Sequence, residues 1–184
     1  EGTFGIVEWK SFNSELSRKG NNNSSKGATN MIQIVIADDH KILLQGLAAL
    51  INPVEDMEII GEASNGDDAL RLLQQKEPDI AVLDVSLPGK SGISVAREVK
   101  KHGLKTKIIL LTLHREALMV EKALESGVMG YVLKDNAFDE LLFSLRTVHS
   151  GGKFISPSIT GDLFDIQSRK KKSSLTQREL EVLK

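Results

Sequence analysis

Apolar runs of strand length alternate with helical patterns between residues 31 and 150. The runs that predict strands are 32–37, 58–64, 79–83, 107–112 and 130–134. Leu43, Leu47 and Leu50 illustrate the helical spacing that separates them. Near-continuous apolar strands that alternate with helices are typical of a parallel sheet covered on both faces. Because crossovers between parallel strands are right-handed, the pattern predicts an α/β fold with a doubly wound (βα)5 five-stranded parallel sheet in the order 2-1-3-4-5.

Polar residues stand at the carboxyl ends of four of the predicted strands. Asp38 and Asp39 follow the first strand, Asp84 follows the third, Thr112 ends the fourth and Lys134 ends the fifth. Open α/β sheets bind ligands at this edge, where the strand order reverses. Since the first and third strands are neighbours in this order, the three carboxylates are expected to converge in one crevice.

Three carboxylates held together repel one another, so the cluster predicts a bound cation. Mg²⁺ fits, because it binds through one or two carboxylates together with water and phosphate oxygens. A phosphoryl group is then the expected second ligand, with Lys134 and the Thr112 hydroxyl facing its oxygens. Asp84 is the acid best placed to attack phosphorus, because it opens the loop DVSLPGKSG, whose tight turn leaves the carboxylate accessible.

The segments IADDH, VLDVSLPGKSG, ILLTLH and GYVLKD occur in an order and spacing that resemble the receiver domain of bacterial two-component response regulators. The resemblance covers about Met31 to Ser150, predicted here as a receiver domain at 31–150. It implies a flavodoxin-like receiver fold in which Asp84 is the phospho-accepting aspartate.

The same resemblance implies a role for each further residue of the site. For Mg²⁺ it implies Asp39, Asp84, the backbone carbonyl of Ser86, and Asp38 acting through water. For the phosphate contact and the conformational switch it implies Lys134, the hydroxyl of Thr112 and the aromatic ring of Tyr131.

Each residue also has a purely structural interpretation. A lone aspartate at a strand end is usually a solvated turn residue or a helix cap. Thr112 could satisfy backbone groups at a strand end, and Tyr131 could be a core aromatic whose hydroxyl reaches the surface. His40 is expected to be structural, because Mg²⁺ prefers oxygen ligands. The joint occurrence of the acids and the lysine favours the functional interpretation.

The end of the chain carries a second signal. Thr176 and Glu179 form a capping box, which predicts a helix starting at Gln177. LTQRELEVL resembles the opening of the helix-turn-helix domain of LuxR/FixJ-type (NarL-like) regulators, so 175–184 is interpreted as the truncated start of that domain. The recognition helix that would enter the major groove is absent from this segment.

A linker is predicted between these parts, at 151–174. Its Pro and Gly residues argue against one continuous helix, and its apolar Phe154, Ile155 and Leu163 are expected to dock on a neighbouring domain. The basic run 169–172 is interpreted as a solvated segment of the linker rather than a nucleic-acid contact.

Composition narrows the class of protein. The sequence has 24 Lys and Arg against 25 Asp and Glu, so its net charge gives no overall attraction to nucleic acid. It has no Cys, which excludes thiol chemistry. No run approaches a membrane span and no signal segment opens the chain, which predicts a cytoplasmic protein. Residues 1–30, which include the polar GNNNSSKGATN, are expected to be a disordered leader or a cloning remnant, with Met31 as the natural start.

Taken together, these features predict a phosphorylation-activated response regulator and not an enzyme. A sensor histidine kinase is the expected phosphoryl donor, and the expected outputs are homodimerisation and DNA binding through the full-length helix-turn-helix domain. A Mg²⁺-dependent phosphohydrolase with an aspartate nucleophile is the main alternative, weakened because Asp84-Val85-Ser86 lacks the D-x-D pattern. Two further alternatives are a flavodoxin-like cofactor binder and a receiver that acts without phosphorylation.

Overall fold

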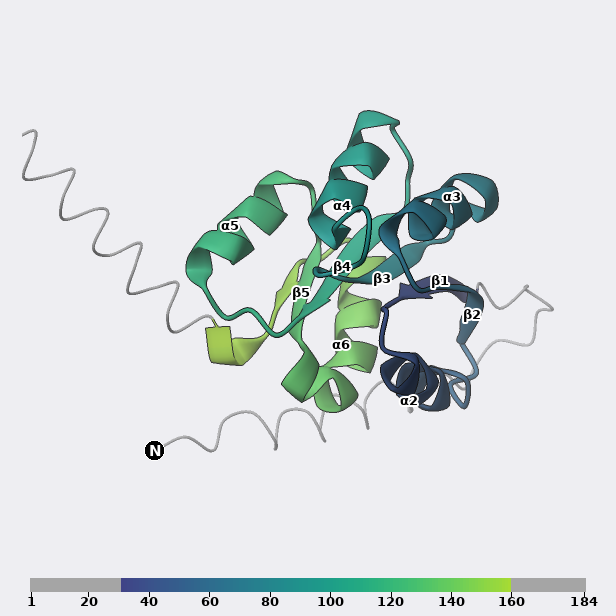
Figure 1. The fold of residues 1–184 in the computed structure, drawn as a ribbon. Helices are drawn as coiled ribbons and strands as arrows, with labels where there is room; N and C mark the ends of the chain where they lie inside the picture. Colours follow the sequence, from purple (N-terminus) through teal and green to yellow (C-terminus); the bar gives the residue numbers. More distant parts are fainter. Residues whose placement is uncertain (1–30, 160–184) are drawn as a thin grey trace, which may run out of the picture. The chain divides into compact units, whose positions relative to one another are not determined.

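The computed structural model describes residues 31–159, in which helices cover a parallel sheet (Figure 1). The strands are β1 (Ile32–Ala37), β2 (Met57–Ala63), β3 (Ile80–Asp84), β4 (Lys107–Thr112), β5 (Gly130–Leu133) and β6 (Phe154–Ile155). The helices are α2 (Lys41–Ile51), α3 (Gly66–Lys76), α4 (Gly92–Lys101), α5 (Ala117–Glu125) and α6 (Ala137–His149), with a 3₁₀ turn η1 (Lys134–Asn136) before α6. The observed order β2-β1-β3-β4-β5-β6 confirms the predicted 2-1-3-4-5 arrangement.

Each face of the sheet has its own apolar core. Helices α3, α4 and α5 lie on one face, and α2 and α6 lie on the other (Figure 1). In β1, Val35 and Ala37 belong to the first core, whereas Ile34 and Ile36 belong to the second. Successive strand residues point to opposite faces, so a strand covered on both sides must be apolar throughout. This arrangement explains the uninterrupted apolar runs and places the polar residues at the strand ends.

Two helix starts at the carboxyl edge of the sheet, those of α3 and α4, are capped by side chains. The Asn65 side chain accepts a hydrogen bond of 2.8 Å from the backbone N–H of Asp68 at the start of α3. The Ser91 hydroxyl accepts a hydrogen bond of 3.2 Å from the backbone N–H of Ser94 at the start of α4. Such caps satisfy N–H groups that have no partner within the helix. They set where the loops at this edge end and the helices begin.

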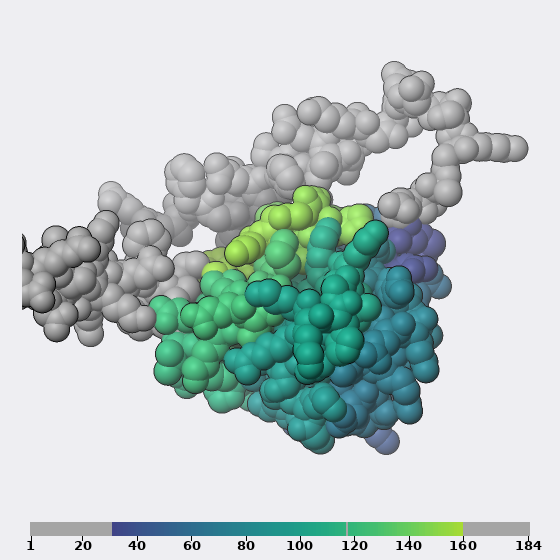
Figure 2. Space-filling view, turned by 90° about the horizontal axis from the view of Figure 1, so that it is seen from above, coloured from purple at the N-terminus to yellow at the C-terminus, as the bar shows by residue number. Residues whose placement is uncertain are grey.

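The prediction of five strands was incomplete, because β6 adds a sixth strand parallel to β5. Its backbone bonds run from Phe154 N–H to the Met129 carbonyl at 3.0 Å and from Ser156 N–H to the Tyr131 carbonyl at 2.9 Å. A strand of two residues is too short to show a periodic pattern in the sequence. Residues 154–155 form a strand because they pair with the edge of β5. The observed β5 also ends one residue before the predicted range of 130–134, because Lys134 begins η1. Figure 2 shows the last described residues, in yellow-green, against the surface of the preceding green segments.

Several predictions concern residues outside 31–159. These are the leader at 1–30, Leu163, the basic run at 169–172 and the helix start at Gln177. Within the described part of the chain, no helix combines the length and apolar character needed to cross a membrane.

Candidate functional site

The two adjacent acids after β1 lie in different environments. Asp38 is fully buried, whereas the side chain of Asp39 is 40% exposed. Oδ1 of Asp38 accepts a hydrogen bond of 2.9 Å from the backbone N–H of His40, and the His40 Nδ1 lies 2.9 Å from the same oxygen. The turn after β1 therefore holds one carboxylate inside the sheet edge and leaves the other facing solvent.

Lys134 joins the carboxyl ends of β1 and β3. Its Nζ lies 2.7 Å from Oδ2 of Asp38 and 3.0 Å from Oδ2 of Asp84, and Asp84 is only 2% exposed. Burial alone lowers the pKa of the Lys134 ammonium, but the hydrogen bonds and negative charges of Asp38 and Asp84 outweigh it and raise the pKa above its ordinary value. The lysine therefore stays charged, and its position depends on both acids.

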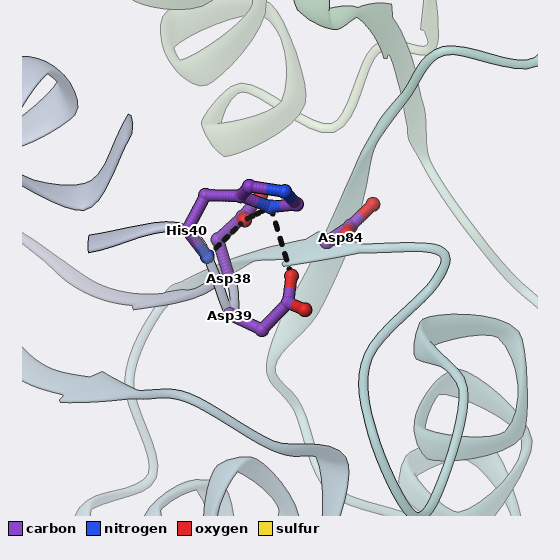
Figure 3. Close-up of side chains that lie close together, drawn as sticks. All are labelled: Asp38, Asp39, His40 and Asp84. Carbon is purple, nitrogen blue, oxygen red and sulfur yellow. Dashed lines mark hydrogen bonds and ion pairs between the residues drawn. The ribbon is translucent and has the colours of Figure 1, made fainter. Parts of the chain in front are cut away.

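The acids form a group with the geometry of a cation site. One ligand atom from each of Asp38, Asp39, His40 and Asp84 can be chosen so that all lie within 4.8 Å of one another (Figure 3). Oδ2 of Asp38 is buried, and the Lys134 ammonium at 2.7 Å is the partner that the described residues give it. Carboxylate oxygens at this spacing suit a hard, oxygen-preferring cation. The donor set therefore fits Mg²⁺.

The contacts of His40 favour the charged form of its imidazole. The hydrogen bond to Asp38 and the charges of Asp39 and Asp38 raise the pKa of the His40 imidazole. A protonated imidazole offers no lone pair to a metal. The structural role expected for His40 agrees with its contacts, since its Nδ1 also lies 2.9 Å from Oδ1 of Asp39.

Thr112 and Tyr131 contact the backbone of the same residue, His114, in the loop after β4. Thr112 is fully buried, and its hydroxyl accepts a hydrogen bond of 3.0 Å from the backbone N–H of His114. The Tyr131 hydroxyl donates to the His114 carbonyl at 3.1 Å. Burial raises the pKa of the Tyr131 phenol, a hydrogen bond with Thr112 lowers it and the charge of Glu116 raises it further, with a net increase. Both residues therefore hold the same loop through its backbone.

The loop after Asp84 packs against the start of α3. The backbone N–H of Gly66 donates to the Pro88 carbonyl at 3.0 Å, and the Lys90 ammonium pairs with the carboxylate of Asp67. Ser86, whose carbonyl was predicted to bind Mg²⁺, is exposed on this loop. A Cβ built on Gly66 would lie 1.8 Å from the Lys90 carbonyl oxygen, so only glycine allows this approach.

The structure thus brings together Asp38, Asp39, Asp84 and Lys134, as the strand order predicted. Sequence reasoning missed Ser156, which is fully buried and hydrogen-bonded to β5 beside Lys134. Its neighbours in the sequence are typical of a loop, and no local pattern marks it. Only the pairing of β6 with β5 brings it to this position.

A doubly wound sheet with buried acids and a lysine at the carboxyl edge, in this strand order, defines a protein of the receiver class. The family model described as the response regulator receiver domain matches residues 34–146, and the chain belongs to that family.

Comparison with similar proteins indicates the subgroup of response regulators that this chain resembles. The transcriptional regulatory protein DesR of Bacillus subtilis is 37% identical over 83% of this chain and 73% of its own length. A two-component response regulator of the LuxR family from Aurantimonas has a structure with a TM-score of 0.72, 30% identity and coverage of 75% of this chain and 99% of its own. RcsB of Salmonella typhimurium has a TM-score of 0.68 at 28% identity, over 73% of this chain and 67% of its own. The relatives are regulators of the LuxR/NarL group.

Proposed function

We propose that this chain receives a phosphoryl group on Asp84 from a sensor histidine kinase and thereby controls an attached DNA-binding domain. The observation that carries the proposal is the position of the Lys134 ammonium, 2.7 Å from Asp38 and 3.0 Å from Asp84. A fixed cation beside a carboxylate nucleophile suits an incoming phosphoryl group, whose oxygens carry negative charge.

The reaction requires an oxygen of Asp84 to form a bond to phosphorus while the bond from phosphorus to the donor breaks. The product is an acyl phosphate on a side chain that is 2% exposed. Lys134 would move from its contact with the Asp84 carboxylate to a phosphoryl oxygen and so keep a charged partner. The chain supplies position and electrostatics for its own modification, which is a regulatory rather than an enzymatic role.

Mg²⁺ is the proposed cofactor of this site. Asp39, Asp84 and the backbone carbonyl of Ser86 would hold it directly, and Asp38 would act through water. When bound, the ion supplies positive charge that offsets the repulsion between the carboxylates and the phosphoryl oxygens. The close grouping of the Asp38, Asp39 and Asp84 carboxylates supports this assignment.

The switch is proposed to run through Thr112 and Tyr131. Both bond to the backbone of His114, Thr112 at its N–H and Tyr131 at its carbonyl. If the Thr112 hydroxyl turns to a phosphoryl oxygen, it releases the His114 N–H, and the loop and Tyr131 can adopt a second packing. The energy gap between two such packings need be only a few kcal/mol.

The proposed output follows from the domain organisation: a receiver at 31–150, a linker at 151–174 and a helix-turn-helix start at 175–184. RcsB, one of the similar proteins, is described as dimers bound to DNA, and its isolated receiver has been solved with the phosphomimetic BeF3−. These relatives support transcriptional control through DNA binding and dimers, and we extend the proposal to dimerisation on phosphorylation and a cytoplasmic location for the complete protein. A phosphohydrolase is not favoured, because the residue two positions after Asp84 is Ser86 rather than an acid.

The test is the intact mass of the chain after incubation with acetyl phosphate, with and without Mg²⁺. We expect a Mg²⁺-dependent gain of one phosphoryl group that is lost in Asp84→Asn. Asp56→Asn is the matched control, because Asp56 is exposed and pairs with Arg146. No gain under any condition would contradict phosphoacceptance, and steady donor consumption without an adduct would support the phosphohydrolase.

A further inference from the structure

The segment after α6 is bonded to the strand that leads into Lys134. In β6, Ile155 pairs with Tyr131, and the next residue, Ser156, donates its backbone N–H to the Tyr131 carbonyl at 2.9 Å. The Ser156 hydroxyl accepts a hydrogen bond of 3.0 Å from the backbone N–H of Leu133. Leu133 directly precedes Lys134, so the contacts of Ser156 fix the backbone from which the lysine side chain extends.

The same hydroxyl also reaches the element that follows Lys134. It donates to Oε2 of Glu140 in the first turn of α6, and Oε1 of Glu140 accepts a hydrogen bond of 2.9 Å from the Asn136 side chain. Lys134 and Asn136 are the two ends of η1. Ser156 therefore links the residue before this turn to the residue at its end, and the lysine lies between the two linked points.

This linkage is enclosed in the core. Ser156 is 0% exposed, and Ile159, at the end of the described chain, is 0% exposed in the same apolar cluster as Tyr131 and Leu133. A buried hydroxyl that loses its partners leaves unpaired polar groups, which makes its geometry strict. We call residues 154–159 the β6 clamp. The clamp belongs to the structure around the lysine, although it follows α6 in the sequence.

We propose that Ser156 is a positioning residue for Lys134, and that the β6 clamp thereby couples the segment after α6 to phosphorylation of Asp84. The proposal rests on the function proposed above. Nζ of Lys134 reaches two carboxylates at the carboxyl ends of β1 and β3, so a small displacement of its backbone changes both distances. Phosphoryl transfer is sensitive to such displacements, because positioning supplies much of the rate. A pull on the clamp from the rest of the predicted linker would act through the same bonds.

The test compares two buried serines. Ser156→Ala removes the hydroxyl beside Lys134, whereas Ser144→Ala removes an equally buried hydroxyl that donates at 2.7 Å to the Leu141 carbonyl within α6. Initial rates of Asp84 phosphorylation by acetyl phosphate with Mg²⁺ would be followed by intact mass, and stability by urea unfolding. We expect Ser156→Ala to slow phosphorylation roughly two- to tenfold, the effect of about one hydrogen bond. Ser144→Ala should also lower the free energy of unfolding, because it removes one buried hydrogen bond. It should leave the phosphorylation rate within about twofold of the unaltered chain, because that hydrogen bond lies within α6 and does not contact the backbone around Lys134.

A double-variant cycle separates positioning from general stability. In a Lys134→Ala background, Ser156→Ala should no longer change the phosphorylation rate, while its effect on urea unfolding should persist. Glu140→Ala, at a half-buried position that accepts the Ser156 bond, should act in the same direction and serves if Ser156→Ala does not fold.

Equal slowing by the Ser156 and Ser144 variants would overturn the proposal, as would an undiminished effect of Ser156→Ala without Lys134. Either result in a chain that still gains a phosphoryl group on Asp84 leaves the proposed function standing. Absence of any phosphoryl gain in the unaltered chain would instead refute the proposed function, and the inference with it.

Discussion

Nζ of Lys134 lies 2.7 Å from Oδ2 of Asp38, a buried carboxylate oxygen for which the described residues offer no other partner. The two residues come from η1 and from the turn after β1, far apart in the sequence. A buried carboxylate without a countercharge is costly, so this lysine is a structural requirement of the metal-free site as well as a group for phosphate. Stability and function therefore share the same residue.

Lys134→Ala is expected to lower the free energy of unfolding, by at most about 3–5 kcal/mol, because it leaves the buried carboxylate of Asp38 without its cation. Urea unfolding at neutral pH in the absence of Mg²⁺ measures the loss. Adding Asp38→Asn to this variant removes the unpaired charge and should restore part of the stability. A Lys134→Ala variant as stable as the unaltered chain would show that the ion pair is not net stabilising. Lys101→Ala, at an exposed lysine, is the control.

Mg²⁺ is expected to raise the melting temperature, because it binds the folded acidic group and not the unfolded chain. At a concentration about one hundred times the Kd, the expected gain is roughly 2.7 kcal/mol. Asp39→Asn should weaken the effect, since the exposed Asp39 carboxylate is a proposed ligand, whereas Asp56→Asn should leave it unchanged. Thermal unfolding over a series of Mg²⁺ concentrations gives the comparison. Equal responses in the two variants would place the ion elsewhere.

Asp84→Asn is expected to stabilise the metal-free chain, by about 0.5–2 kcal/mol, because it removes one of three mutually repelling carboxylates and leaves the Lys134–Asp38 pair intact. Functional sites commonly carry such a stability cost. Urea unfolding of the two chains without Mg²⁺ measures the difference. A less stable variant would mean that the Asp84–Lys134 contact outweighs the repulsion.

Tyr131 should titrate above the ordinary tyrosine pKa of about 10, because burial disfavours the phenolate. It is the only tyrosine among the 184 residues, so the ultraviolet absorbance of tyrosinate reports this residue alone. Since the folded state favours the neutral phenol, its contribution to stability is present below the unfolded pKa and is lost as pH rises through the folded pKa. Tyr131→Phe should show a shallower loss of stability in that range. A midpoint at or below 10 in the folded chain would refute the prediction.

Gly66→Ala is expected to destabilise the chain by about 1–3 kcal/mol, the usual cost of overpacking, because the new Cβ would meet the Lys90 carbonyl oxygen at 1.8 Å. Backbone must move to accept it. Gly61→Ala in β2 is the matched control, since its nearest neighbour would be a flexible Leu72 methyl at 3.4 Å. Urea unfolding of both variants gives the comparison, and equal losses would contradict the close approach of the loop.

Local pattern was sufficient for most of the sheet. β1 and β4 match the predicted ranges, and β2 and β3 differ from them by one residue at each end. β3 and β4 are buried along almost their whole length, so burial leaves a continuous apolar signal in their sequence, whereas the edge strand β2 is partly exposed. The site followed from the same reasoning, because the strand order brings the ends of β1 and β3 together.

Tertiary structure decided the features that leave no local signal. Phe138 follows the helical spacing of α6, but its side chain is 56% exposed in the folded chain. The sequence by itself determined the α/β class, the strand order and the acids and lysine at one edge, since these depend on periodicity and on the ends of apolar runs. Only the folded chain decided that Asp38 is buried and Asp39 is not, and that Phe154–Ile155 completes the sheet beside Lys134. Those outcomes depend on which backbone groups find partners far away in the sequence, and hydrogen-bond partners of that kind are set by packing rather than by neighbouring residues.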